Sequence, residues 1–204
     1  MKRSIGTYQI TLSSLLTALM LILGYIESTL PSLGIPGIKL GLSNGVLIFA
    51  EYMLNIPLAY VLFTMKVVLS SLLFSGFQTF PYAFTGGLVS LTVMSLMSRS
   101  SAFKPVVVSI AGGVTHNIGQ VMMAILIAHL PVREMLYYLG ILMLVGLACG
   151  AVTGTIADSV IKRIKAGRIR MPAVDKKGGR TVQILSILLI LICAYIAYRS
   201  ASGN

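Results

Sequence analysis

The stretch LAYVLFTMKVVLSSLLF, from Leu58 to Phe74, indicates the kind of fold, because its one charged residue is Lys66. A helix that crosses the hydrocarbon core of a bilayer needs roughly 20 predominantly apolar residues. The stretch, extended to 57–75, is therefore predicted to span a membrane. The rest of the chain has the same character, since 56% of its 204 residues are hydrophobic and 10% are charged. Soluble domains carry about 25% charged residues, so the sequence predicts a multi-pass membrane protein.

Apolar runs of similar length predict six membrane-spanning helices and a seventh near the C-terminus. The second and third spans are joined almost directly by Asn55-Ile56-Pro57, where the proline ends one helix and can begin the next. The seventh run, Val182 to Tyr198, follows a basic stretch and has no pocket-building residues. The predicted fold is an all-α membrane protein: a six-helix transmembrane bundle plus a C-terminal seventh transmembrane helix. The six spans cover about 9–27, 42–55, 57–75, 79–98, 105–130 and 135–161, and the chain divides into a six-helix unit (1–165), a basic cytoplasmic linker (166–181) and a C-terminal anchor (182–204).

The formal net charge of +11 arises mainly from basic residues that lie beside the apolar runs. Anionic lipid and membrane topology account for that placement, so no nucleic-acid partner is predicted. Cytoplasmic loops retain lysine and arginine. Here these residues are Lys2 and Arg3 before the first span, Arg99 and Lys104 after the fourth, and a run over 162–180 after the sixth. The N-terminus is therefore predicted to be cytoplasmic and the loop between the first two spans to be external.

Lys66 lies near the middle of the third predicted span. An ionisable group in hydrocarbon costs at least about 2.5 kcal/mol on insertion, so it normally faces a partner or a cavity. One interpretation pairs Lys66 with Glu51 across the tight hairpin, although their distances from the turn leave an axial offset of roughly 7 Å at 1.5 Å per residue. The other interpretation is that Lys66 holds an anionic ligand.

The fifth span contains the polar stretch AGGVTHNIGQ, from Ala111 to Gln120. His116 and Gln120 are four residues apart and share a helix face, and Asn117 lies beside them. Near the centre of a bilayer these side chains need hydrogen-bonding partners. They are predicted either to clamp this helix to a neighbour or to line a substrate cavity, and the preceding glycines permit close helix packing.

Two further spans carry weaker indications of a binding site or a docking face. The fourth begins GFQTFPYAFTGG, in which Gln78 and Tyr82 lie at the outer end; an interfacial aromatic belt explains this pattern as well as a binding site does. The first span presents Ser14 and Ala18 at a four-residue spacing. Small residues at this spacing let membrane helices touch, so this face is predicted either to pack inside the bundle or to dock another subunit.

The sequence lacks the motifs of several common kinds of enzyme. Its acidic residues stand apart, whereas an enzyme acting on diphosphates is expected to hold magnesium with clustered carboxylates. A GxxxxGK[ST] phosphate loop, a Ser-His-Asp set and an HExxH motif are also missing. We therefore expect a protein that is not an enzyme and has no metal site or intrinsic cofactor. If it moves a molecule uphill, partner subunits must hydrolyse the ATP.

Two motifs carry a family resemblance: GIPGIKLGLSN, from Gly34 to Asn44, and GGVTHNIGQ, from Gly112 to Gln120. Together with the six-span pattern over roughly 5–165, they resemble the bacterial family called heptaprenyl diphosphate synthase component I, also known as Gx transporter proteins. That family is similar in turn to the substrate-binding S components of energy-coupling factor (ECF) transporters. The chain lacks the acidic motifs that prenyl chain elongation needs, so its residues do not support the synthase name.

The resemblance to S components implies a six-helix bundle in the bacterial plasma membrane that captures a vitamin- or cofactor-like molecule from outside. It implies as partners a transmembrane coupling (T) subunit and two ATPases, with Ser14 and Ala18 as a weakened form of the docking face. The loop between the first two helices would close over the pocket through Gly34, Pro36, Gly37 and Gly41. The rival hypothesis is a non-catalytic membrane subunit of heptaprenyl diphosphate or quinone biosynthesis. The predicted ligand is a small anion, and the predicted substrate-binding residues are Lys39, Asn44, Lys66, Gln78, Tyr82, His116, Asn117 and Gln120.

Overall fold

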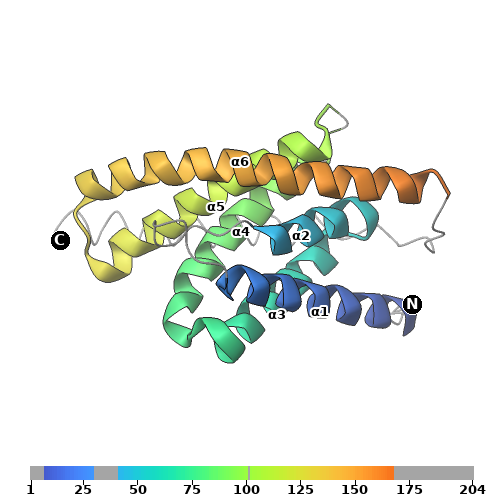
Figure 1. Cartoon of the computed structure of the whole chain (residues 1–204), viewed down its shortest axis with the longest axis horizontal. Helices are drawn as coiled ribbons and strands as arrows, with labels where there is room; N and C mark the ends of the chain where they lie inside the picture. The colour runs from blue at the N-terminus through green and yellow to red at the C-terminus, as the bar shows by residue number, and fades with distance from the viewer. Residues whose placement is uncertain (1–6, 30–40, 101, 168–204) are drawn as a thin grey trace.

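The computed structural model describes residues 7–29, 41–100 and 102–167, and the regular secondary structure of this part is helical throughout (Figure 1). Between α3 and α4 the chain forms a π-helical turn, Ser71–Ser75 (η1), and a short 3-10 turn, Phe77–Thr79 (η2). The predicted seventh helix lies outside the described residues, as do Gly34, Pro36, Gly37 and Lys39. The α-helices are α1 (Thr7–Thr29), α2 (Leu42–Met53), α3 (Ile56–Ser70), α4 (Phe80–Met97), α5 (Pro105–Ala128) and α6 (Val132–Lys165).

Five helical segments of the described part are long and apolar enough to cross a membrane, which agrees with a multi-pass membrane protein. The second predicted span is the exception. Helix α2 has 12 residues and is about 18 Å long at 1.5 Å per residue, whereas the hydrocarbon core is about 30 Å thick. The prediction of six full spans is therefore not confirmed. The five segments are Thr11–Thr29, Ile56–Ser75, Phe77–Met97, Pro105–Ala128 and Val132–Lys165.

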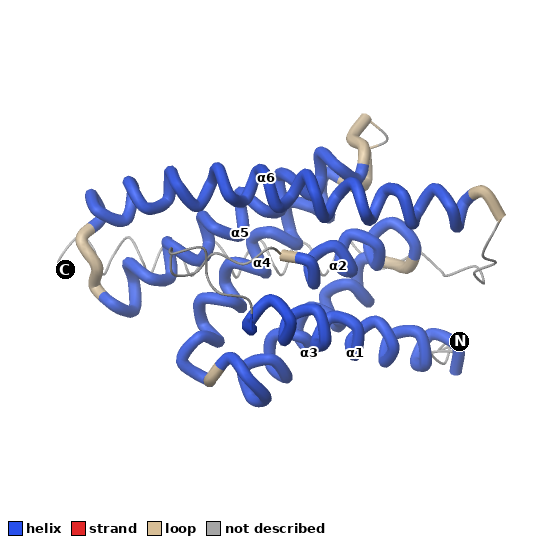
Figure 2. Tube along the Cα trace, in the orientation of Figure 1, coloured by secondary structure: helices blue, strands red, loops and turns tan. Residues whose placement is uncertain are grey.

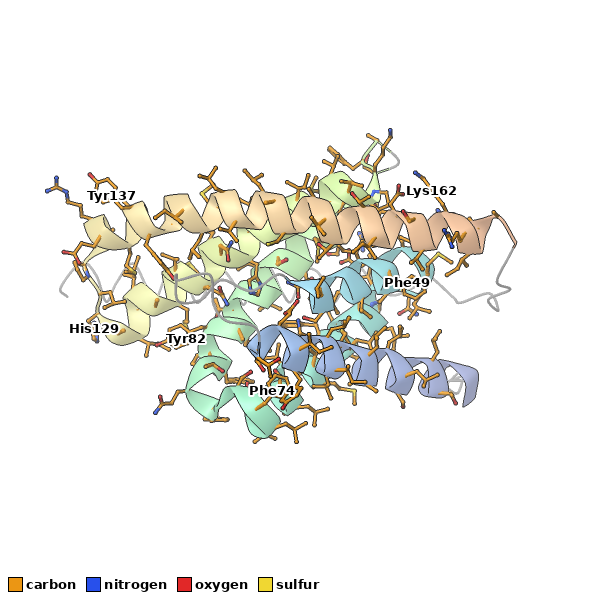
Figure 3. All side chains as sticks on the ribbon, viewed as in Figure 1. Phe49, Phe74, Tyr82, His129, Tyr137 and Lys162 are labelled. Atoms are coloured by element: carbon orange, nitrogen blue, oxygen red, sulfur yellow. The ribbon has the colours of Figure 1, made fainter. Side chains whose placement is uncertain are left out.

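Helices α1, α2 and α6 run roughly along the long axis of the molecule, and α4 runs obliquely to them (Figure 2). Helix α5 packs against both α4 and α6, while α2 packs against α6, α1 and α3. The C-terminal end of α6, with Lys162, lies far from the end that carries His129 and Tyr137 (Figure 3). We name the first the basic end and the second the opposite end. The basic end carries Arg99, Lys104, Lys162, Arg163 and Lys165.

Helices α5 and α6 approach to backbone contact along a stripe of glycines on α6. A Cβ atom built at Gly150 would lie 2.8 Å from the Cα of Ile110, and one at Gly154 would lie 2.8 Å from the Cα of Val106. A Cβ at Gly113 would overlap the carbonyl oxygen of Gly146. Small residues four apart permit such packing between membrane helices, and it holds the polar segment of α5 firmly against α6.

The apolar core lies where α1, α2, α3 and α4 meet. Met20, Ala50, Leu62 and Leu91 are fully inaccessible there. Other large apolar side chains point outward, as expected of helices that face lipid rather than water. Exposed examples include Leu15, Leu72, Leu144 and Val152. Three residues of this core, Met20, Phe63 and Val67, also line the polar cavity described next.

The cap of α3 offers a test of local helix stability. The side chain of Asn55 accepts a hydrogen bond from the backbone N–H of Leu58 at 2.8 Å. We expect Asn55→Ala to destabilise the protein by about 0.5–2 kcal/mol, because one N–H of the first turn loses its partner. Thermal unfolding in detergent would show a lower midpoint. Asn55→Ser retains a capping oxygen and is expected to melt close to the wild type; equal losses for both variants would contradict the capping role.

Candidate functional site

A polar cavity of about 90 Å³ lies between α1, α2, α3, α4 and α5, in the half of the bundle nearer the opposite end. The predicted polar residues reach it from helices that are remote in sequence. At roughly 30 Å³ per water molecule, the volume holds only a few waters or one small polar group. A vitamin-sized molecule requires the cavity to widen, since small-molecule sites measure about 300–1,000 Å³. The predicted residues that line it are Gly41 and Asn44 of the α2 N-terminus, Lys66 of α3, and His116, Asn117 and Gln120 of α5.

Lys66 is partly buried and donates a hydrogen bond from its Nζ to the side-chain oxygen of Asn44 at 2.9 Å. This contact joins α3 to the first turn of α2. The alternative prediction, an ion pair between Lys66 and Glu51, is wrong, because both carboxylate oxygens of Glu51 are buried and have no hydrogen-bond partner among the described residues, Lys66 included. The axial offset between the two residues explains the result. Lys66 reaches the start of α2, while Glu51 lies near its end.

Glu27 brings a carboxylate to the same cavity. Its Oε1 accepts a hydrogen bond from the backbone N–H of Leu42, at the start of α2. Helix N-termini favour such negative groups, because their first N–H groups lack intrahelical partners. Gly41, which precedes the helix, has φ 71°, in the left-handed region that glycine adopts without strain. Glu27 therefore fixes where α2 begins and places a carboxyl group in the cavity that Lys66 also lines.

The α5 cluster contains the predicted helix clamp, and its other members line a cavity whose ligand stays a prediction. Asn117 is buried, and its Nδ2 donates to the carbonyl oxygen of Leu142 on α6 at 2.6 Å, so it clamps the two helices together. His116 and Gln120 are only partly buried and line the cavity. The Gln120 side chain lies against Gly86 of α4, where a Cβ atom would approach its Cγ to 2.6 Å. Gly86 thus provides the space that Gln120 occupies.

An aromatic wall borders the cavity on the α3–α4 side. Gly87 and Phe63 both line the cavity, and a Cβ at Gly87 would overlap the Phe63 ring. The Phe63 ring stacks on Phe84 at 5.7 Å between centroids, and Phe84 stacks on Phe80 at 5.5 Å. Stacked rings of this kind give rigid apolar surfaces. Side chains at the cavity that the sequence did not single out include Glu27, Ser43, Ser70, Ser71, Phe74, Ser75 and Thr79.

Gln78 and Tyr82 are not brought into this cavity. Gln78 is exposed in the 3-10 turn η2. Tyr82 lines a separate pocket of about 230 Å³ together with Gln120 and Tyr138, and Figure 3 shows it near the start of α4. Because Gln120 also lines the polar cavity, the Tyr82 pocket is its immediate neighbour.

A second, smaller cavity of about 40 Å³ continues from the first toward the basic end. It shares Asn44, His116 and Asn117 with the polar cavity, and its wall includes Ile48 of α2. Hydroxyl groups lie along it, and the Ser109 and Thr153 oxygens are 3.1 Å apart. The two cavities together follow α2 over most of its length.

The small-residue face of α1 lies on the outside of the described bundle. Ser14 and Ala18 are both exposed. The interpretation that they pack inside the six-helix unit is therefore not supported. Docking of another subunit on this face stays a prediction.

The fold and its cavities define a class of protein: an α-helical multi-pass membrane protein with a buried polar cavity built on α2, α3 and α5. The chain belongs to the heptaprenyl diphosphate synthase component I family, whose sequence profile matches residues 16–160. This match confirms the family predicted from the two motifs and includes every residue that lines the polar cavity. Searches of curated proteins and of solved structures find no match. The similarity to ECF S components stays a prediction.

Proposed function

We propose that this protein is the substrate-capture (S) subunit of an ECF-type importer in the bacterial plasma membrane, with its N-terminus in the cytoplasm. Its ligand is a small anionic molecule of vitamin or cofactor type. One observation carries the proposal: Asn44, Lys66, His116 and Gln120, which the sequence placed on three predicted helices, meet at one cavity within the bundle. Ionisable and amide side chains are expensive in a membrane interior and mark substrate sites there.

The chemistry of the cavity favours a carboxylate or phosphate group. Lys66 donates to the uncharged amide oxygen of Asn44, whereas an anionic acceptor beside Nζ would add Coulomb attraction to the hydrogen bond. An anion bound beside Nζ would therefore compete well for this donor. His116 and Gln120 line the same cavity and can donate further hydrogen bonds.

In this proposal, partner proteins supply the energy for transport against a gradient. The sequence has no phosphate-loop motif for binding ATP. A coupling (T) subunit and two ATPases would supply hydrolysis, and the exposed Ser14–Ala18 face of α1 is the proposed docking surface. The protein itself is proposed to be neither an enzyme nor the holder of a cofactor.

A second candidate function rests on the family description, which names a heptaprenyl diphosphate synthase component. In that case the chain is a non-catalytic membrane subunit that presents a prenyl diphosphate to a soluble synthase. The same Lys66 cavity would bind the anionic diphosphate. The two candidates differ in their protein partners, so recovery of those partners separates them.

The deciding experiment is purification of the tagged full-length protein from its native membrane in mild detergent, followed by mass spectrometry of bound proteins and small molecules. We expect a coupling subunit with two ATPases. Ala18→Phe is expected to reduce the recovery of these partners, because the large phenylalanine ring would prevent close helix contact at the proposed docking face. Val61→Phe changes an exposed position on α3 and serves as the matched control. Recovery of a soluble prenyl synthase without ATPases would instead establish the second candidate.

A further inference from the structure

Glu51 is a buried carboxyl that the ligand cavity does not use. It lies on α2, close to the basic end, with 7% of its surface exposed. Within the described part of the chain, neither of its carboxylate oxygens has a hydrogen-bond partner. An ionised carboxylate moved out of water costs several kcal/mol even after the surrounding protein relaxes. A carboxyl in this position must therefore be paired with a cation or be neutral.

Glu51 has no pairing cation among the described residues. On α6, the ionisable residues at about the same height in the bundle as Glu51 are Asp158 and Lys162. They form an ion pair with each other at 2.6 Å. On α3, the Tyr60 hydroxyl is bonded to Thr92 at 2.9 Å, and Lys66 donates to Asn44 near the far end of α2. The remaining helices packed against α2 are α1, α4 and α5, and their segments 11–20, 88–97 and 105–115 carry no ionisable side chain. Other groups near this end are Tyr52, whose hydroxyl donates to the Phe103 carbonyl oxygen at 3.3 Å, and the exposed Arg99 and Lys104.

A metal ion does not fit these surroundings. Hard cations take about six to eight oxygen ligands, whereas Glu51 is flanked on its own helix by the buried apolar residues Leu47, Ala50 and Leu54. The described part of the chain also has no group of three His, Cys, Asp or Glu side chains suited to a metal. A proton needs no such shell, because it neutralises the carboxyl directly. The proton is thus the ligand that these surroundings can hold.

We propose that Glu51 is a proton-binding site inside the bundle: it holds a proton in this conformation and releases it only when the end of α2 opens to water. The position of Glu51 on α2 links the proton-binding site to the two cavities. Ile48, one helical turn before Glu51, lines the second cavity, and Asn44, one turn further, bonds Lys66. Movement of the short helix α2 would therefore act on the proton site and on the Lys66 contact together. The inference does not depend on which ligand the polar cavity binds.

Infrared spectroscopy of the full-length protein in lipid tests this proposal, because a protonated carboxyl has a carbonyl stretching band that a carboxylate lacks. The probe is pH alone. At neutral pH we expect the wild type to show a protonated-carboxyl band that Glu51→Gln removes. Glu134→Gln is the matched control. Glu134 is exposed in the first turn of α6, so this variant should leave the band unchanged.

The melting temperature of Glu51→Gln provides a second measurement. Glutamine has nearly the shape of a protonated glutamate and carries no charge, so the variant should melt as the wild type does. An absent band at neutral pH, with a carboxylate signal lost in Glu51→Gln instead, would overturn the proposal. A Glu51→Gln protein that fails to fold would also count against it, because that outcome indicates a need for the charged form.

Discussion

Replacing Lys66 with methionine is expected to weaken the binding of an anionic ligand by roughly tenfold to a hundredfold. Methionine keeps an apolar stem of similar length but removes the ammonium group that donates to Asn44 in the structure. Hydrogen bonds to charged groups contribute about 1.5–3 kcal/mol, and about 1.4 kcal/mol corresponds to a factor of ten in affinity. The measurement is a titration of the purified variant with the anion recovered from the wild-type protein.

The control ligand for this experiment is a neutral analogue of the same molecule. Its affinity should fall much less in Lys66→Met, because it does not use the lysine charge. Equal losses for the charged and the neutral molecule would show structural damage rather than lost charge recognition. Lys162→Met is the matched control, since Lys162 is an exposed lysine at the basic end, paired with Asp158. It should leave both affinities unchanged.

Replacing Gly146 with valine is expected to be the most damaging single change to the fold. A Cβ atom at Gly146 would lie 2.8 Å from the Gly113 carbonyl oxygen and 2.8 Å from the amide nitrogen of Asn117. The two helices must then separate, which also breaks the hydrogen bond from Asn117 to Leu142. Overpacking costs about 1–3 kcal/mol, and the lost hydrogen bond adds about 1 kcal/mol. We expect little monodisperse protein and a lower melting temperature in detergent.

Gly140→Val is the matched control on the same helix. Apart from the neighbouring turns of α6 itself, no atom of the described residues lies within 4 Å of a Cβ built at Gly140, so valine there should not overlap another helix. Size-exclusion profiles and melting curves of the two variants should therefore differ clearly. Similar behaviour would mean that the close approach of α5 to α6 contributes little to stability.

The helix positions were largely predictable from the sequence, because apolar length and proline placement act locally. The predicted span 57–75 corresponds to α3 and η1, which together end at Ser75, and the span 105–130 corresponds to α5, Pro105–Ala128. Proline in the first turn of each of these helices and the capping Asn55 of α3 explain the sharp starts. Helix α2 was also located correctly, but its length shows that an apolar run can be a short buried helix rather than a full span.

The candidate site was predictable only where one residue or one helix carried the signal. A lone lysine in an apolar span marked Lys66, and the four-residue spacing of His116 and Gln120 marked the α5 face. The glycine spacing of Gly146, Gly150 and Gly154 was present in the sequence as well, and a search for small residues four apart would have found it. The docked α5–α6 pair could have been inferred from that stripe.

Composition, apolar length and isolated polar residues thus established a helical membrane protein with Lys66 and the His116–Gln120 face as unusual groups in its interior. Which groups meet across helices followed from packing alone. Glu27 reaches the Leu42 N–H, Lys66 reaches Asn44, and Glu51 has no hydrogen-bond partner in the part of the chain that the structure describes. The physical reason is that these relationships depend on the depth and rotation of separate helices. The backbone contacts between helices determine both quantities, and no local spacing in the chain encodes them.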